Sequence, residues 1–258
     1  MRKTLIAVGV ASVLALAGCG GGSGPAKTEA PAEKPAAAAS APADDANAAT
    51  VTGKVAFTGE KPTPKTLSME ATPACSRAHS TPQKSQEVIV NGNGTLANTL
   101  VWVKAGLPAK EWPTPATAVK LDQKGCMYTP HVIAVMANQN IEVTNSDPTN
   151  HNIHPLPKTN REWNESQPPN GDAKMKQFAR EEIMIPVKCN VHPWMRSYVS
   201  VLGHPFFAVT GDDGSFSIKG LPPGEYTVEA VHEKYGAKEM KVTVGAKESK
   251  AVDFSFAG

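Results

Sequence analysis

A short segment near residue 190 carries three side chains that can bind a metal. Cys189, His192 and Met195 lie in the sequence Cys-Asn-Val-His-Pro-Trp-Met, with two residues between each and the next. A thiolate, an imidazole and a thioether are soft or borderline ligands, and Pro193 stiffens the backbone between the last two. One more imidazole would complete a His₂Cys plane with a weak axial Met, a set that favours copper. The segment therefore predicts a copper site.

The missing imidazole can come from a second segment upstream. His151-Asn-Ile-His154 follows the turn at Asn145-Ser-Asp147 and offers two candidates. We favour His151 as the ligand. His154 is then a strand or surface residue, or an alternative residue that supports a ligand by a hydrogen bond. Both segments need strands to hold them together.

The composition favours short strands over helices. The 258 residues include 22 Pro and 21 Gly, and long apolar periodic stretches are missing. Such a chain is typical of an all-β fold. The net charge is +2 and no Lys/Arg cluster forms a phosphate-binding face, so nucleic-acid binding is excluded.

Alternating apolar and polar residues predict where the strands lie. The strands expected before residue 205 cover 51–57, 88–90, 99–103, two within 131–143, 182–187 and 198–202. The last two flank the segment that begins at Cys189. Helix signals are scarce, and the polar segment 163–180 holds one short helix at most.

The order of strands and ligands over residues 85–204 resembles the cupredoxin family, nearest to amicyanin and plastocyanin-like proteins. The resemblance implies a Greek-key β-sandwich with one type 1 copper site. It implies that Cys189 supplies the thiolate, that His151 and His192 supply the imidazoles, and that Met195 is axial. It also implies that Asn152 ties the two ligand loops together by hydrogen bonds. A long insertion at 155–179 departs from the family's pattern.

The C-terminal residues 205–258 show a second pattern of short strands. These lie at 206–210, 215–218, 225–231, 239–244 and 251–256, with Gly- and Pro-containing turns between them. They predict a smaller β-sandwich. Residues 209–228 resemble the carboxypeptidase regulatory-like (transthyretin-like) domain, a non-catalytic module. Residues 51–57, within the irregular segment 51–84, look like its first strand, which would make the copper domain an insertion. The alternative is an extra strand on the cupredoxin sheet.

The N-terminus predicts export and anchoring. Residues 1–18 have a basic start and an apolar run that ends in small residues before Cys19, which resembles a bacterial lipobox. A plain signal peptide is the alternative. An acylated Cys19 would attach the protein to a membrane in the periplasm, and Gly20 favours the outer membrane. Residues 19–50, rich in Ala, Pro and Gly, are expected to form a disordered tether.

Cys75 and Cys126 leave three possibilities open. In an exported protein two further cysteines most often form a disulfide. His79 and His131 lie near them in the sequence, so a second metal site is an alternative, and free thiols are the third.

The functional hypothesis is a copper protein that carries single electrons and is not an enzyme, because four protein ligands leave no open position for a substrate. His192 is expected near the surface as the point of electron exit. Pro193 and Trp194 are expected to dock a transient redox protein, although Trp194 is equally compatible with core packing. We expect a monomer. The alternatives are a protein for copper storage or delivery, and a metal-free surface-binding module.

Overall fold

The computed structural model describes residues 46–258, and the regular structure in them is almost entirely β. Seventeen strands and one five-residue helix, α1 (Pro73–Arg77), account for it, so the all-β fold class is confirmed. The predicted signal segment, Cys19 and nearly all of the tether lie outside the described residues. Within residues 46–258, no helix has the length and hydrophobicity needed to cross a bilayer.

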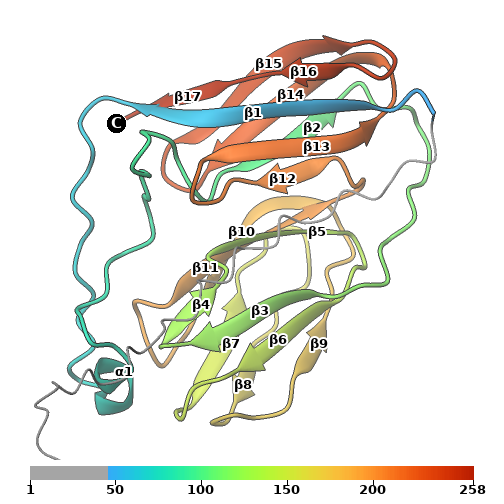
Figure 1. Ribbon diagram of the computed structural model, residues 1–258. Coiled ribbons are helices and arrows are strands. Elements are labelled where there is room, and N and C mark those ends of the chain that lie inside the picture. The colour runs from blue at the N-terminus through green and yellow to red at the C-terminus, as the bar shows by residue number, and fades with distance from the viewer. Residues whose placement is uncertain (1–45) are drawn as a thin grey trace, which may run out of the picture. The chain divides into compact units, whose positions relative to one another are not determined.

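Two sheets form what we call the central sandwich (Figure 1). The five-stranded sheet contains, in spatial order, β5 (Val132–Met136), β11 (Arg196–Leu202), β10 (Glu182–Lys188), β7 (His151–Pro155) and β8 (Glu165–Gln167). The four-stranded sheet contains β4 (Met127–Thr129), β3 (Val119–Lys124), β6 (Ile141–Asn145) and β9 (Lys174–Lys176). The pairs β5–β11 and β3–β6 are parallel, and the other pairs are antiparallel.

Buried and more exposed residues alternate along these strands, and the buried side chains of both sheets form one core between them. In β6, for example, Ile141, Val143 and Asn145 are buried while Glu142 and Thr144 are partly exposed. Ile141 and Val143 pack in one cluster with inward residues of the other sheet, among them Ile153, Val187 and Val199. The same cluster contains Cys75, Cys126, Cys189 and Met195, so the candidate ligand loop is built into the end of this core.

Eight strands form what we call the C-terminal sandwich. One sheet contains β13 (Ser215–Leu221), β1 (Ala49–Thr58), β16 (Ser249–Ala251) and β17 (Phe254–Ala257). The other contains β12 (Phe207–Val209), β2 (Leu100–Ala105), β14 (Gly224–His232) and β15 (Gly236–Val244). A second core of Val, Ile and Phe side chains lies between them.

The strand near residue 51 belongs to the C-terminal sandwich. It pairs antiparallel with β13 and parallel with β16 and β17. The alternative, an extra strand on the cupredoxin sheet, is therefore not what the structure has. The strand begins at Ala49, two residues earlier than expected, so the end assigned to the tether at residue 50 falls inside β1.

The second early strand, β2, differs from the expectation. The sequence placed residues 99–103 in the copper domain, within 85–204, but β2 pairs with β12 and β14 of the C-terminal sandwich. Four consecutive residues, Leu100 to Val103, are buried because the strand has a core on both faces. Leu100 and Trp102 pack with Met136 and Leu202 of the central sandwich, whereas Val101 and Val103 face the other core. An apolar run on its own does not reveal which sheet it joins.

Candidate metal centre

Strand pairing brings the two predicted ligand segments to the same end of the central sandwich. β7 runs antiparallel to β10, with His154 opposite Lys188. The residues that open β7 therefore lie beside the residues that follow β10. His151 is the first residue of β7, and Cys189 comes directly after β10. The loop from Cys189 to Met195 then turns the chain into β11.

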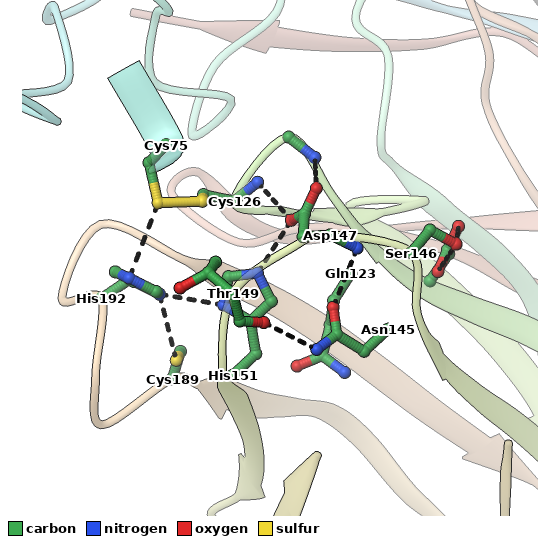
Figure 2. A network of polar contacts seen from close by, with 12 residues as sticks. Cys75, Gln123, Cys126, Asn145, Ser146, Asp147, Thr149, His151, Cys189 and His192 are labelled. Carbon is green, nitrogen blue, oxygen red and sulfur yellow. Dashed lines mark hydrogen bonds and ion pairs between the residues drawn. A yellow bond between two sulfur atoms is a disulfide. The ribbon is translucent and has the colours of Figure 1, made fainter. Parts of the chain in front are cut away.

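Three potential ligand atoms converge at this point (Figure 2). The Nδ1 atoms of His151 and His192 are 2.9 Å apart, and His192 Nδ1 lies 3.9 Å from Cys189 Sγ. All three ligand atoms lie within 4.8 Å of one another, and each residue is no more than 3% exposed. First-row metal bonds of about 2.0 Å to nitrogen and 2.3 Å to sulfur place ligand atoms at similar separations. The side chains therefore fit one copper ion.

Met195 closes the loop. Its backbone N–H donates to the His192 carbonyl at 3.0 Å, and its carbonyl accepts from the Cys189 N–H at 3.2 Å. These bonds pull the three residues into one tight turn. The Met195 side chain is fully buried in the same core cluster as Cys189. The backbone of Met195 is thus tied to both Cys189 and His192, and its side chain is buried in the core that Cys189 shares.

Asn152 links the two segments. Its Oδ1 accepts a hydrogen bond from the Asn190 N–H at 2.7 Å and from the Cys189 thiol at 3.3 Å. This is the role that the resemblance to cupredoxins implied. The link holds the start of β7 against the ligand loop and leaves the thiol with a defined orientation.

His154, the alternative upstream ligand, points elsewhere. Its Nε2 lies 2.6 Å from Glu162 and its Nδ1 lies 3.2 Å from the Asn190 side chain. His151 is fully buried beside the thiol, whereas His154 is partly exposed. Three residues apart on a strand, the two side chains face opposite sides of the sheet. The structure therefore brings His151, and not His154, into the cluster with Cys189 and His192.

A carboxylate that the sequence did not reveal supports His151. Asp147 Oδ2 lies 2.8 Å from His151 Nε2. The same carboxylate accepts hydrogen bonds from the backbone N–H groups of Gly125 at 2.6 Å and Cys126 at 2.7 Å. A carboxylate on the outer nitrogen fixes the tautomer and orientation of a ligand histidine. An Asp four residues before a His is too common a pattern to have indicated this role.

The two remaining cysteines, Cys75 and Cys126, form a disulfide. Cys75 Sγ lies 3.6 Å from His192 Nε2, on the side of the ring opposite the ligand cluster (Figure 2). His192 is only 1% exposed, so the expectation that it lies near the surface is wrong. The covering residue, Cys75, sits on α1, a helix that the sequence did not predict.

Pro193 and Trp194, the two residues expected to dock a partner, differ from each other in burial. Pro193 is exposed on the loop, whereas Trp194 is partly buried and packs against the central core. The Trp194 indole N–H donates to the Cys126 carbonyl at 3.0 Å. Its ring centroid is 5.1 Å from that of His192. Trp194 therefore contacts the site and also reaches the outer surface of the loop.

The surroundings of His151, Cys189 and His192 shift the pKa values of all three side chains. Burial and the neighbouring His151 lower the pKa of His192 to about 4, so its imidazole is neutral at neutral pH. Burial opposes charge on His151, but its hydrogen bonds to Asp147 and Cys189 outweigh this and raise its pKa. Burial would raise the pKa of the Cys189 thiol, but hydrogen bonds from His151 and from loop backbone groups lower it. A thiolate is the form that binds a metal.

Comparison with known families gives a match over most of the C-terminal sandwich. Residues 195–257 match the family model of the carboxypeptidase regulatory-like domain. The regulatory-like domain predicted from the sequence is therefore confirmed. The match begins at Met195 and includes β11 of the central sandwich, and it leaves out β1 and β2. A comparison with curated proteins gave no significant match.

Solved structures similar to part of the chain include copper proteins. A Cu-containing nitrite reductase from Thermus scotoductus SA-01 is 16% identical (TM-score 0.29); the match covers 36% of this chain and only 25% of the reductase. A purple cupredoxin from Nitrosopumilus maritimus is 20% identical over 32% of this chain and 98% of its own length (TM-score 0.28). A reduced Trp-to-Tyr variant of amicyanin is 21% identical over 37% of this chain and 97% of its own (TM-score 0.30).

Proposed function

We propose that this protein carries single electrons on one copper ion held by His151, Cys189, His192 and Met195. The observation that carries the proposal is the convergence of two imidazole nitrogens and a thiol sulfur at one buried point. Cys and His with a Met beside them are the donors that blue-copper electron-transfer sites use. When bound, copper would supply a one-electron redox couple.

The chain's own residues provide what such a couple needs. Cys189 offers a polarizable thiolate, which would be the main electronic path from a bound ion into the protein. Asp147 and Asn152 hold His151 and the ligand loop in place, so these residues would move little when a bound ion changed its oxidation state. Burial excludes water, and four protein ligands leave a substrate no position to occupy. We therefore propose a carrier and not an enzyme.

We further propose that the protein is an exported lipoprotein. The residue pattern ending at Cys19 supports acylation, with anchoring in the periplasm and, by Gly20, to the outer membrane. The Ala-, Pro- and Gly-rich residues that follow would act as a tether for a monomeric folded head. The proposed partner is a transient redox protein. Mass spectrometry of the mature N-terminus would test the acylation.

One rival function has an observation in its favour. The match of residues 195–257 to a non-catalytic module is compatible with a surface-binding protein that uses no metal. Copper storage is less favoured, because the two spare cysteines are joined in a disulfide and supply no thiolates.

Copper titration followed by voltammetry tests the proposal. We expect one tightly bound copper per chain and a reversible one-electron wave. Stoichiometric binding with no reversible wave would favour storage or delivery. No binding at all would favour the surface-binding module. A His154→Ala variant is a suitable control, because this histidine lies outside the ligand cluster and should leave both results unchanged.

A further inference from the structure

The outer edge of His192 is not available to a redox partner. The ring is 1% exposed, and its Nε2 faces Cys75 Sγ at 3.6 Å. Cys75 lies on α1 and is joined covalently to Cys126, and both cysteines are themselves buried. A partner that approaches from this side meets α1 and the disulfide. The edge of His192 therefore offers a partner no direct contact.

Trp194 is the aromatic residue that joins the site to open surface. Its ring lies 5.1 Å from that of His192, centroid to centroid, at an interplanar angle of 39°. The indole N–H is fixed by the Cys126 carbonyl. The same side chain lines a groove of about 330 Å³, which we call the Trp194 groove. Its other lining residues include Lys65, Met127, His131, Arg196 and Glu233. Trp194 thus contacts the buried ligand on one side and the groove on the other.

The two acidic residues that line the Trp194 groove each contact a histidine or lysine side chain. Glu233 contacts His131 Nε2, and both side chains are at least nine-tenths buried. Glu87 lies 3.5 Å from Lys234.

The two basic residues of the groove differ from its acidic residues because they have no charged partner in the part of the chain that the structure describes. Lys65 and Arg196 are exposed, and within residues 46–258 neither forms an ion pair. Arg196 follows Met195 directly in the sequence and lies two residues from Trp194. Unpaired positive charge next to the aromatic group attracts an anionic partner and speeds its encounter.

We propose that electrons enter and leave through Trp194, to a redox partner that presents negative charge to the Trp194 groove. The inference rests on the proposed copper function. With copper bound, the outward step would oxidise the site by one electron, and the anionic acceptor would be reduced by that same electron. No proton moves and no bond forms. The surface used is thus the Trp194 groove and not the edge of a ligand histidine.

The first test locates an anion on the metal-free, full-length protein. Hexacyanochromate(III) is a paramagnetic trianion that broadens the NMR signals of groups near it. The chain has four tryptophans, so the indole N–H signals of Trp102, Trp112 and Trp163 are internal controls. We expect selective broadening at Trp194 that is lost in Arg196→Ala and kept in Arg161→Ala. Broadening at Trp163 instead, or broadening that ignores Arg196→Ala, would overturn the proposal.

The second test measures the rate at which ferricyanide oxidises the copper(I) protein. Arg196→Ala should slow it about threefold to tenfold at low salt and reduce its salt dependence. Trp194→Leu should slow it about tenfold, within the range that mutants of one interface span. Trp194→Phe, which keeps an aromatic ring, should stay closer to the unmodified protein.

The outcomes separate the two proposals. Unchanged rates in Trp194→Leu and Arg196→Ala, with the visible spectrum intact, would overturn the Trp194 route. A copper-loaded protein without the visible thiolate-to-copper band would instead contradict the copper function itself. The NMR experiment uses no copper, so it tests anion binding at the Trp194 groove whether or not the protein carries copper.

Discussion

At the scale of residues, the candidate site depends on hydrogen-bonding groups outside the proposed ligand set as much as on the proposed ligands. Asp147 holds His151 by its outer nitrogen and is itself held by two backbone N–H groups. Burial would raise the pKa of this carboxyl, but its hydrogen bonds to His151 and to the backbone lower it. The carboxylate is therefore charged at neutral pH and aligns the imidazole before any metal arrives.

Asp147→Asn should weaken copper binding by about 10–100-fold, the usual cost of losing such a partner. The amide cannot accept from His151 and from both backbone N–H groups as a carboxylate does. Competition with a copper chelator measures the change. Asp122→Asn is the matched control, because this carboxylate accepts from Thr144 and Ser146 but touches no histidine. Equal affinities in both variants would contradict the role given to Asp147.

The convergence of the proposed ligands could be predicted in part from the sequence because their spacing carries the information. Cys189, His192 and Met195 share one loop, and two-residue gaps limit what such a loop can do. The choice between His151 and His154 was harder, and the structure makes it through the side of β7 that each faces. Cys75 was not predicted, since it reaches the site from a distant segment. Asp147 lies only four residues from His151, but its role depends on how the turn between them folds back, which the spacing does not reveal.

At the scale of elements, the short helix α1 acts as a cover for the ligand loop. The Cys75–Cys126 disulfide joins α1 covalently to the core of the central sandwich. The sequence separation of 51 residues means that the cross-link closes a long loop. Long closed loops restrict the unfolded chain most.

Replacing Cys75 and Cys126 together by Ala should lower the free energy of unfolding by about 4 kcal/mol in the loop-entropy account. Urea unfolding of the metal-free protein measures this. The same variant should make His192 more accessible, which chemical modification by diethyl pyrocarbonate would detect. A variant with unchanged stability and an unreactive His192 would show that the disulfide neither stabilises nor covers the site.

Strand β1 is held against the C-terminal strands by a close approach at Gly53. A Cβ atom there would lie 1.8 Å from the Val252 carbonyl oxygen. Gly53→Ala should therefore destabilise the protein by about 1–3 kcal/mol, the usual cost of overpacking. Gly92→Ala is the control, since no atom of residues 46–258 outside the adjacent residues lies within 4 Å of its Cβ position. If thermal unfolding shows the two variants to be equally stable, β1 is not packed as described.

At the scale of the whole molecule, the sequence of the central sandwich is inserted within the sequence of the C-terminal sandwich. β1 and β2 precede the central sandwich in the sequence, and β12 to β17 follow it. The all-β class and most strands could be predicted from alternation and turn residues. The assignment of β2 to the C-terminal sandwich could not, because its continuous apolar run suits any strand that is buried on both faces.

The C-terminal sandwich should make stability depend on pH through His232. This residue is 2% exposed, and burial, as the main cause, lowers its pKa to about 4 from 6.5. Between these two values the unfolded chain binds a proton that the folded chain does not. Stability contributed by neutral His232 is therefore present above pH 6.5 and is lost as the pH falls toward 4.

Urea unfolding of the metal-free protein at several pH values checks this. The unmodified protein should lose stability on acidification more steeply than His232→Gln, by up to about 1.4 kcal/mol per pH unit. His192 titrates with a similarly lowered pKa in both proteins, so it cancels in the difference. Parallel pH profiles would contradict a buried neutral His232.

The central claim is that Cys189 binds copper as a thiolate together with His151 and His192. The visible absorption spectrum of the copper(II)-loaded protein tests it most directly. We predict an intense thiolate-to-copper band in the unmodified protein, loss of that band in Cys189→Ser, and its retention in His154→Ala. A copper-loaded protein without the band, or a band that survives Cys189→Ser, would contradict the account.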